Sequence, residues 1–177
     1  MAKVGRPEAG EFAPYFERYV ALVPGDDPVA ALAEQAAAVR DALGGVTEAG
    51  AGFRYAPEKW SIREVVGHCS DAERVFAYRA LAFARGEKAA LPPFDENEFA
   101  RLAGHDRVAL AELLDEFAAV RAATLHLLRH LPADAWRRRG VASGKGISVR
   151  AVAFVMAGHV AHHLGLLRDR YGAPPRG

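Results

Sequence analysis

The sequence predicts an all-α protein built as a four-helix bundle, and three observations support this prediction. Four segments of roughly 16 to 26 residues place apolar side chains at helical spacing. Breaks that contain Gly and Pro separate these segments. No segment alternates apolar and polar residues in the way that a half-buried strand requires. Four helices of this length, each with an apolar face, bury those faces by packing against one another.

The first helix is expected at residues 28–43. Pro28 suits the first turn because its missing N–H is not needed there, and a Gly-Gly pair ends the helix. Residues 12–23 carry bulky side chains and are expected to form a shorter helix or turn that packs on the bundle. The linker at residues 44–60 is long enough for a crossover connection between the first and second helices.

The second helix is expected to begin at Ser61 and to run to about Gly86. Ser61 and Glu64 have the form of a capping box, in which the Ser hydroxyl accepts a hydrogen bond from the Glu backbone and the Glu carboxylate reaches back. Trp60 stands just before the cap, where a hydrophobic staple places an apolar residue. Residues 90–106, rich in Pro and acidic side chains, are expected to form a loop.

The third helix is expected to begin after Asp106, acting as its N-cap, and to end at Leu131, before a Pro. Residues 136–146 are basic and are interpreted as a solvated connection between helices, without a strand. The fourth helix is expected from near Ser148 to Gly172, with two Pro beyond it.

Length and composition favour a single domain at residues 12–172, with a flexible N-terminal tail at 1–11 and a C-terminal tail at 173–177. The formal net charge of +1 argues against a general binder of nucleic acid or of a membrane surface. Cys69 is the single cysteine, so no internal disulfide can form and a reducing compartment is expected. No stretch reaches the ~18 uncharged apolar residues that cross a membrane. We therefore expect a cytoplasmic protein that acts without nucleic acid or membrane.

Three histidines in apolar surroundings are the candidate functional residues. His159 and His163 are four residues apart in the fourth helix and so share one helix face, and His68 has the same inward position on the second helix. Burying such side chains costs several kcal/mol unless their nitrogens are hydrogen-bonded or bound to a metal. Three neutral imidazoles leave a coordination position open, as reactive metal sites do. The alternative is that each is a core histidine bonded to a neighbouring side chain.

Other residues near the candidate site carry weaker signals. His126 and His130 have the same spacing but fall in the last turns of the third helix, where a histidine interacts favourably with free carbonyls. Asp71 and Asp95 are candidate carboxylates for orienting a metal-binding imidazole. For Asp71 a polar position on the helix flank is an equal alternative, and for Asp95 a loop-capping role is the more ordinary interpretation. The fourth helix is not a zincin helix, because Val160 stands where the HExxH motif has its Glu.

Three blocks of sequence together resemble the DinB-like/YfiT-like superfamily of metal-binding four-helix bundles. They are WSIREVVGHCSDAERVFAYRALAF, PFDENEF and AGHVAHHLGLLRDRY, and the resemblance extends from about Tyr15 to Tyr171. It implies a divalent metal ion, zinc or nickel, held by one histidine of the second helix and two of the fourth. At the matching positions of this sequence these are His68, His159 and His163.

The same resemblance implies an activity only broadly. Members include S-transferases that use bacillithiol or mycothiol, thiol-dependent isomerases, and proteins described as metal-dependent hydrolases. We therefore expect a metal-dependent enzyme that activates a small thiol or water and acts on a small-molecule substrate, with a low-molecular-weight thiol as the expected co-substrate of a transferase. Dimers are common in the family, so a homodimer is expected. The alternative is a non-catalytic, stress-related bundle whose metal is structural.

Overall fold

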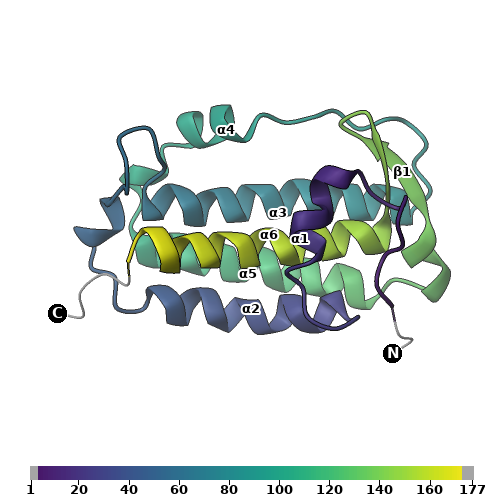
Figure 1. Ribbon diagram of the computed structural model, residues 1–177, viewed down its shortest axis with the longest axis horizontal. Helices are drawn as coiled ribbons and strands as arrows, with labels where there is room; N and C mark the ends of the chain where they lie inside the picture. The colour runs from purple at the N-terminus through teal and green to yellow at the C-terminus, as the bar shows by residue number, and fades with distance from the viewer. Residues whose placement is uncertain (1–3, 173–177) are drawn as a thin grey trace.

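The computed structural model describes residues 4–172 and confirms the four-helix bundle (Figure 1). Within the bundle, helices α2 and α3 each pack against both α5 and α6, so that α2 and α3 occupy opposite corners. The four helices are α2 (Pro28–Leu43), α3 (Ile62–Ala84), α5 (Leu110–Arg129) and α6 (Val149–Arg170).

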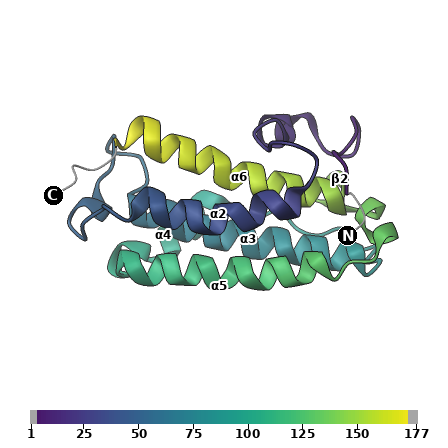
Figure 2. The same cartoon turned by 90° about the horizontal axis from the view of Figure 1, so that it is seen from below.

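The chain direction makes this bundle differ from a simple up-and-down arrangement. In Figures 1 and 2, α3 and α5 run one way and α2 and α6 run the other. The linker between α2 and α3 includes the 3-10 turn η2 (Gly50–Gly52) and joins opposite corners of the bundle. Because α3 and α5 are parallel neighbours, residues 85–109 return along the length of the bundle before α5 begins.

Helix starts follow the local chemistry of the sequence. The capping box is present: the Ser61 hydroxyl accepts from the Glu64 N–H at 3.1 Å, and the Glu64 carboxylate accepts from the Ser61 N–H at 2.8 Å. Ser148 caps α6 by accepting from the Ala151 N–H at 3.1 Å. Pro28 is the first residue of α2, as its fixed φ and missing N–H predict.

The prediction that the chain contains no strand was wrong. The basic connection forms an antiparallel hairpin of β1 (Arg139–Ala142) and β2 (Lys145–Ser148). Its two turn residues, Ser143 and Gly144, have φ values of 52° and 71°, the left-handed conformation that two-residue hairpin turns need. Strands of four residues are too short to show clear alternation, and Ser-Gly is a weaker turn signal than Asn-Gly.

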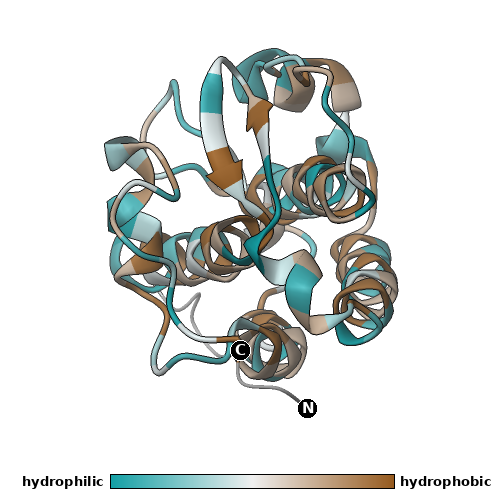
Figure 3. Cartoon of the chain, turned by 90° about the vertical axis from the view of Figure 1, so that its right-hand side faces the viewer, coloured by the Kyte–Doolittle hydropathy of each residue, from teal (hydrophilic) through white to brown (hydrophobic). Residues whose placement is uncertain are grey.

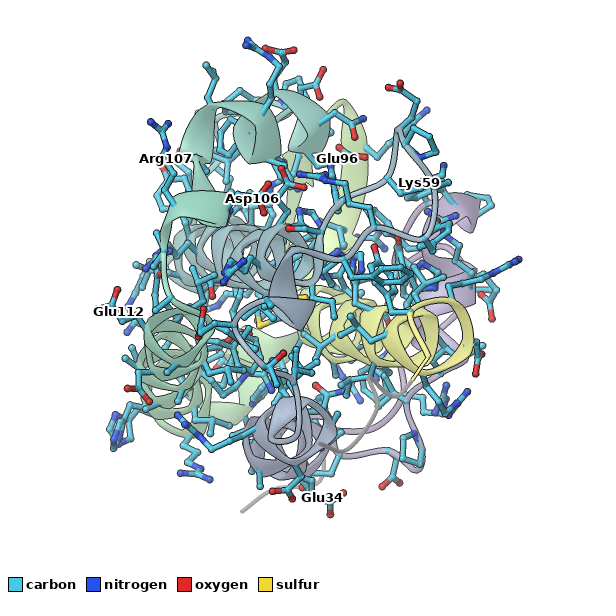
Figure 4. All side chains as sticks on the ribbon, turned by 90° about the vertical axis from the view of Figure 1, so that its left-hand side faces the viewer. Glu34, Lys59, Glu96, Asp106, Arg107 and Glu112 are labelled. Atoms are coloured by element: carbon cyan, nitrogen blue, oxygen red, sulfur yellow. The ribbon has the colours of Figure 1, made fainter. Side chains whose placement is uncertain are left out.

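The prediction of a continuous loop before the third long helix was also wrong. Residues 90–106 contain helix α4 (Glu96–Ala103), which Asp95 caps and Gly104 ends with a left-handed φ of 69°. Helix α5 begins at Leu110, so Asp106 is not its N-cap. Asp106 instead lies in the 3-10 turn η3 (His105–Arg107) and accepts hydrogen bonds from Ser61 and Arg54. Figure 4 shows Asp106 at this end of the bundle, near α4.

The segment before α2 packs against α6. It forms η1 (Pro14–Phe16) and α1 (Glu17–Val20), and α1 packs on α6 at Gly158. A Cβ added to Gly158 would lie 1.9 Å from the carbonyl oxygen of Tyr19, so only glycine permits this approach.

Residues 4–11, assigned from the sequence to a tail, are anchored to the rest of the chain. Arg6 donates to backbone carbonyls of Val20, Val23 and Gly25, and Glu11 pairs with Arg150 of α6. Residues 1–3 and the predicted tail at 173–177 lie outside the described residues.

The buried core is mostly apolar, and hydrophobic residues recur along the bundle helices in Figure 3. Helix α6 is the most enclosed element, because every residue from 149 to 160 is buried. Charged side chains such as Glu34 and Glu112 lie on the periphery (Figure 4). Among the described residues, no helix combines the length and the apolar character that crossing a bilayer requires.

Candidate metal centre

The structure brings His68, His159 and His163 together between α3 and α6. The Nε2 atom of His159 is 3.0 Å from Nε2 of His68 and 3.1 Å from Nε2 of His163. All three side chains are buried. Within residues 4–172, this is the one cluster of three potential ligands that could hold a metal ion. The four-residue spacing on α6 thus has the consequence expected from the sequence, and α3 supplies the third imidazole.

Burial keeps the three imidazoles neutral. It lowers the pKa of His68 to about 4 and that of His163 to about 3, and it holds the pKa of His159 well below the usual value. Neighbouring imidazoles, His68 among them, depress the pKa values of His159 and His163 further, because a second positive charge nearby would be repelled; for His68 the neighbour that acts in this way is His105. All three side chains are therefore in the form that binds metal at pH 7.

Hydrogen bonding alone cannot satisfy this arrangement. An Nε2 atom of a neutral imidazole carries either one proton or one lone pair, yet Nε2 of His159 faces two other Nε2 atoms. A common cation accepts all three lone pairs. Metal–nitrogen bonds of about 2.0–2.1 Å at angles between 90° and 110° separate the nitrogens by about 2.8–3.4 Å. The two separations from His159, 3.0 and 3.1 Å, lie in that range, and all three ligand atoms lie within 4.8 Å of one another. The donor set therefore fits a divalent metal ion.

Aromatic side chains, rather than carboxylates, position these rings. Trp60 lies against His68 with ring centroids 4.5 Å apart and stacks over His163 at 6.3 Å. Tyr19 meets the edge of His159 at 5.7 Å. The Nδ1 atom of His163 is buried and has no hydrogen-bond partner among the described residues. Ring packing therefore replaces the carboxylate that often orients a metal-binding histidine.

The cluster opens into a cavity of about 520 Å³, which we call the histidine cavity. Its walls come from α1, α3, α6, the β-hairpin and the loop that precedes α4. Most of its lining is apolar, with a few polar groups that include Tyr19, Arg79 and Lys145. Burial raises the pKa of Tyr19 to about 12, so its phenol stays protonated and can donate a hydrogen bond. A concave apolar site with a few polar groups is typical of small-molecule binding.

The two carboxylates that were candidates for orienting an imidazole, those of Asp71 and Asp95, have other contacts. Asp71 pairs with Arg74 and lies 3.8 Å from Nε2 of His105, and Asp95 caps α4. Neither has a contact with the three clustered histidines in the described structure. The carboxylate that does line the histidine cavity is Glu96, which is exposed.

The remaining histidines and the cysteine stay outside the cluster. His126 and His130 are exposed at the end of α5, as their helix-end position predicted. Cys69 is buried in the core, and burial raises its thiol pKa to about 12, so it is a poor nucleophile. His162 lines the histidine cavity and contacts the Tyr19 ring, but it does not belong to the cluster.

Sequence reasoning missed three residues that shape the cavity: Tyr19, Trp60 and Arg79. A signal was available for Arg79, because it follows His68 by eleven residues, which is three helical turns on one face. Tyr19 and Trp60 carry no such signal, since each reaches the site from a segment that the helical pattern does not place. Of the basic connection, Lys145 lines the cavity, whereas Arg138 and Arg139 donate to backbone carbonyls elsewhere.

Comparisons with known proteins agree on the fold. The sequence model of the DinB superfamily matches residues 31–167. A solved structure of YfiT from Bacillus subtilis, described as a probable metal-dependent hydrolase with an unusual four-helix bundle topology, superposes with a TM-score of 0.73. It is 19% identical, and the alignment covers 94% of this chain and 93% of that one. No curated protein sequence matches the chain.

Proposed function

The chain belongs to the DinB superfamily, and we propose that it is a metal-dependent enzyme whose ion is held by His68, His159 and His163. The observation that carries this proposal is the convergence of three neutral imidazoles at the wall of a cavity of about 520 Å³. A structural zinc site is closed by four protein ligands, whereas three ligands beside a cavity leave room for a reactant. This favours an enzyme over a non-catalytic bundle with a structural metal.

A bound zinc or nickel ion would supply Lewis acidity, lowering the pKa of a water or thiol so that it reacts at neutral pH. The protein's own residues perform the other tasks. The apolar lining excludes water from the reacting groups, and the neutral phenol of Tyr19 donates a hydrogen bond to a substrate oxygen. Trp60 and Tyr19 hold the imidazole planes in place.

Water and a small thiol are the two nucleophiles that the proposal allows. Hydrolysis is supported by the fold shared with YfiT, itself described as a probable metal-dependent hydrolase. Transfer of a small anionic thiol of the bacillithiol type is supported by the cationic side chains of Arg18, Arg79 and Lys145 in the cavity lining. The proposal further includes a small-molecule substrate and a homodimer. It also includes a cytoplasmic location, which the single cysteine, Cys69, supports.

Metal analysis of untagged protein tests the first requirement. We expect about one equivalent of zinc or nickel in the wild-type chain and almost none in His159→Ala. His126→Ala is the matched control, because it removes an exposed histidine far from the cluster and should leave the metal content unchanged. A wild-type protein that binds neither ion after purification and reloading would overturn the proposal.

Activity assays then separate the two nucleophiles. Ester hydrolysis that chelation abolishes and added zinc or nickel restores would identify a hydrolase. Conjugation of bacillithiol to a reactive aromatic halide, with the same dependence on metal, would identify a transferase. A metal-loaded protein without either activity, whose melting temperature falls on chelation, would point to the non-catalytic alternative.

A further inference from the structure

Three arginines are buried in the described part of the chain, and one of them lacks a carboxylate. Arg121 is fully buried and makes three hydrogen bonds to the Glu73 carboxylate, at 2.7 to 2.9 Å. Arg150, 6% exposed, pairs with Glu11. Arg79, 5% exposed, has no Asp or Glu within ion-pair distance among residues 4–172. A buried, unpaired positive charge is costly, so it indicates a partner that binds there.

The Arg79 guanidinium is held in place but is only partly used. Its Nη2 donates to the Pro92 carbonyl and to the Ser143 hydroxyl, both at 3.0 Å. Its Nε and Nη1 atoms have no acceptor among the described residues. The group also lies against the rings of Phe76 and Phe94, 5.9 and 5.7 Å from their centroids. Three N–H donors thus remain available on a guanidinium that lines the histidine cavity.

Helix α3 places this cation at a defined distance from the histidine cluster. His68 and Arg79 are separated by eleven residues, which is about 16 Å along the axis and close to three full turns. Ala72 and Phe76 lie between them and line the same cavity. Because both side chains tilt toward the N-terminus of α3, the tilt leaves their axial separation close to this value.

We propose that Arg79 binds the carboxylate of a small substrate whose apolar body lies along Ala72 and Phe76 and whose other end reaches the histidine cluster. That the other end of this substrate reacts at the histidine cluster rests on the proposed function, whereas the binding of its carboxylate by Arg79 does not. One guanidinium suits a singly charged oxyanion, which a carboxylate is. The apolar floor between cation and cluster suits a hydrocarbon spacer.

A purely structural role for Arg79 is the competing explanation. Its bonds to Pro92 and Ser143 fasten the hairpin tip to the loop that precedes α4, where Leu91 also pairs with the hairpin. Those bonds use both hydrogens of Nη2 alone. They account for neither the free donors nor the uncompensated charge.

A matched ligand pair tests the proposal. Binding of 6-phenylhexanoate and of its uncharged amide would be measured by displacement of the neutral fluorophore N-phenyl-1-naphthylamine from metal-free and zinc-loaded protein. We expect the carboxylate to bind about tenfold more tightly than the amide in both forms, and Arg79→Gln to abolish this preference. Arg79→Lys, which keeps the charge, should retain part of it. Arg85→Gln is the control, because it removes an exposed arginine at the C-terminal end of α3, outside the lining of the histidine cavity, and should keep the preference.

The outcomes separate this inference from the proposed enzyme activity. Unchanged binding of the neutral fluorophore shows that each variant keeps an intact cavity. Loss of the preference in Arg79→Gln, in a protein that binds no metal at all, supports the carboxylate site while refuting the enzyme. An equal preference in wild type and Arg79→Gln overturns the carboxylate site, as does a wild-type protein that binds acid and amide alike.

Discussion

Substitution of Gly158 by Ala tests whether the contact between α1 and α6 is as close as the structure shows. The added Cβ would lie 1.9 Å from the Tyr19 carbonyl oxygen and 2.4 Å from its carbonyl carbon. Both neighbours are backbone atoms, so no rotamer change relieves the clash and α1 must move away from α6. Tyr19 and Val20 would then lose part of their burial.

Two opposing effects determine how much Gly158→Ala changes the free energy of unfolding. Replacing a mid-helix Gly by Ala favours the helix by about 1 kcal/mol. Overpacking a close contact costs about 1–3 kcal/mol, and partial exposure of two large apolar side chains adds about 2 kcal/mol more. The net expected loss is about 2–4 kcal/mol of unfolding free energy, or roughly 4–16 °C in melting temperature for a chain of this size.

Gly165→Ala is the matched control on the same helix. No heavy atom lies within 4 Å of its added Cβ, so helix propensity acts alone and the variant should be more stable than wild type by about 0.5–1 kcal/mol. Both variants would be measured by urea denaturation and by calorimetry. Equal stability of the two Ala variants would refute the close packing of α1 on α6.

Three further predictions concern buried or paired groups. Arg150 lowers the pKa of Glu11 from 4.5 to about 2, so this carboxylate stabilises the fold above pH 4.5 and the stabilisation is lost as the pH falls toward 2. In Glu11→Gln the unfolding free energy should therefore depend less on pH between 4.5 and 2. The same pH dependence in wild type and variant would contradict the pairing. Glu73→Gln leaves the Arg121 charge buried and should cost about 3–5 kcal/mol in urea denaturation, whereas a loss below about 1 kcal/mol would show that the pair is not buried. Cys69 should resist iodoacetamide at pH 8 in the folded protein and react only in denaturant, because burial raises its thiol pKa to about 12. Rapid labelling of the native protein would show that the thiol is not buried.

The sequence predicted the features that depend on local chemistry and helical periodicity. The bounds of α2, the capping box of α3 and the Ser148 cap of α6 all follow from residue types at fixed positions. The shared face of His159 and His163 follows from helical geometry. Their meeting with His68 follows from no local rule, because it depends on which helices become neighbours.

The mistakes arose where tertiary contacts override local signals. Helix α4 has eight residues and the strands have four each, lengths at which periodicity carries little information. Asp106 has the chemistry of an N-cap, but it accepts from Ser61 and Arg54 instead. Helical spacing could have placed Arg79 on the same face as His68, but its lack of a carboxylate partner depends on tertiary contacts that the spacing does not reveal.

The place of α6 in the chain has a consequence for biosynthesis. The two histidines that face His68 and the arginine that anchors Glu11 all lie on the helix that the ribosome makes after every other helix of the bundle. Until α6 emerges, His68 has neither of the two imidazoles that it faces in the folded chain, and the N-terminal segment lacks the helix on which it packs. The proposed metal site can therefore be completed only after α6 has been synthesised.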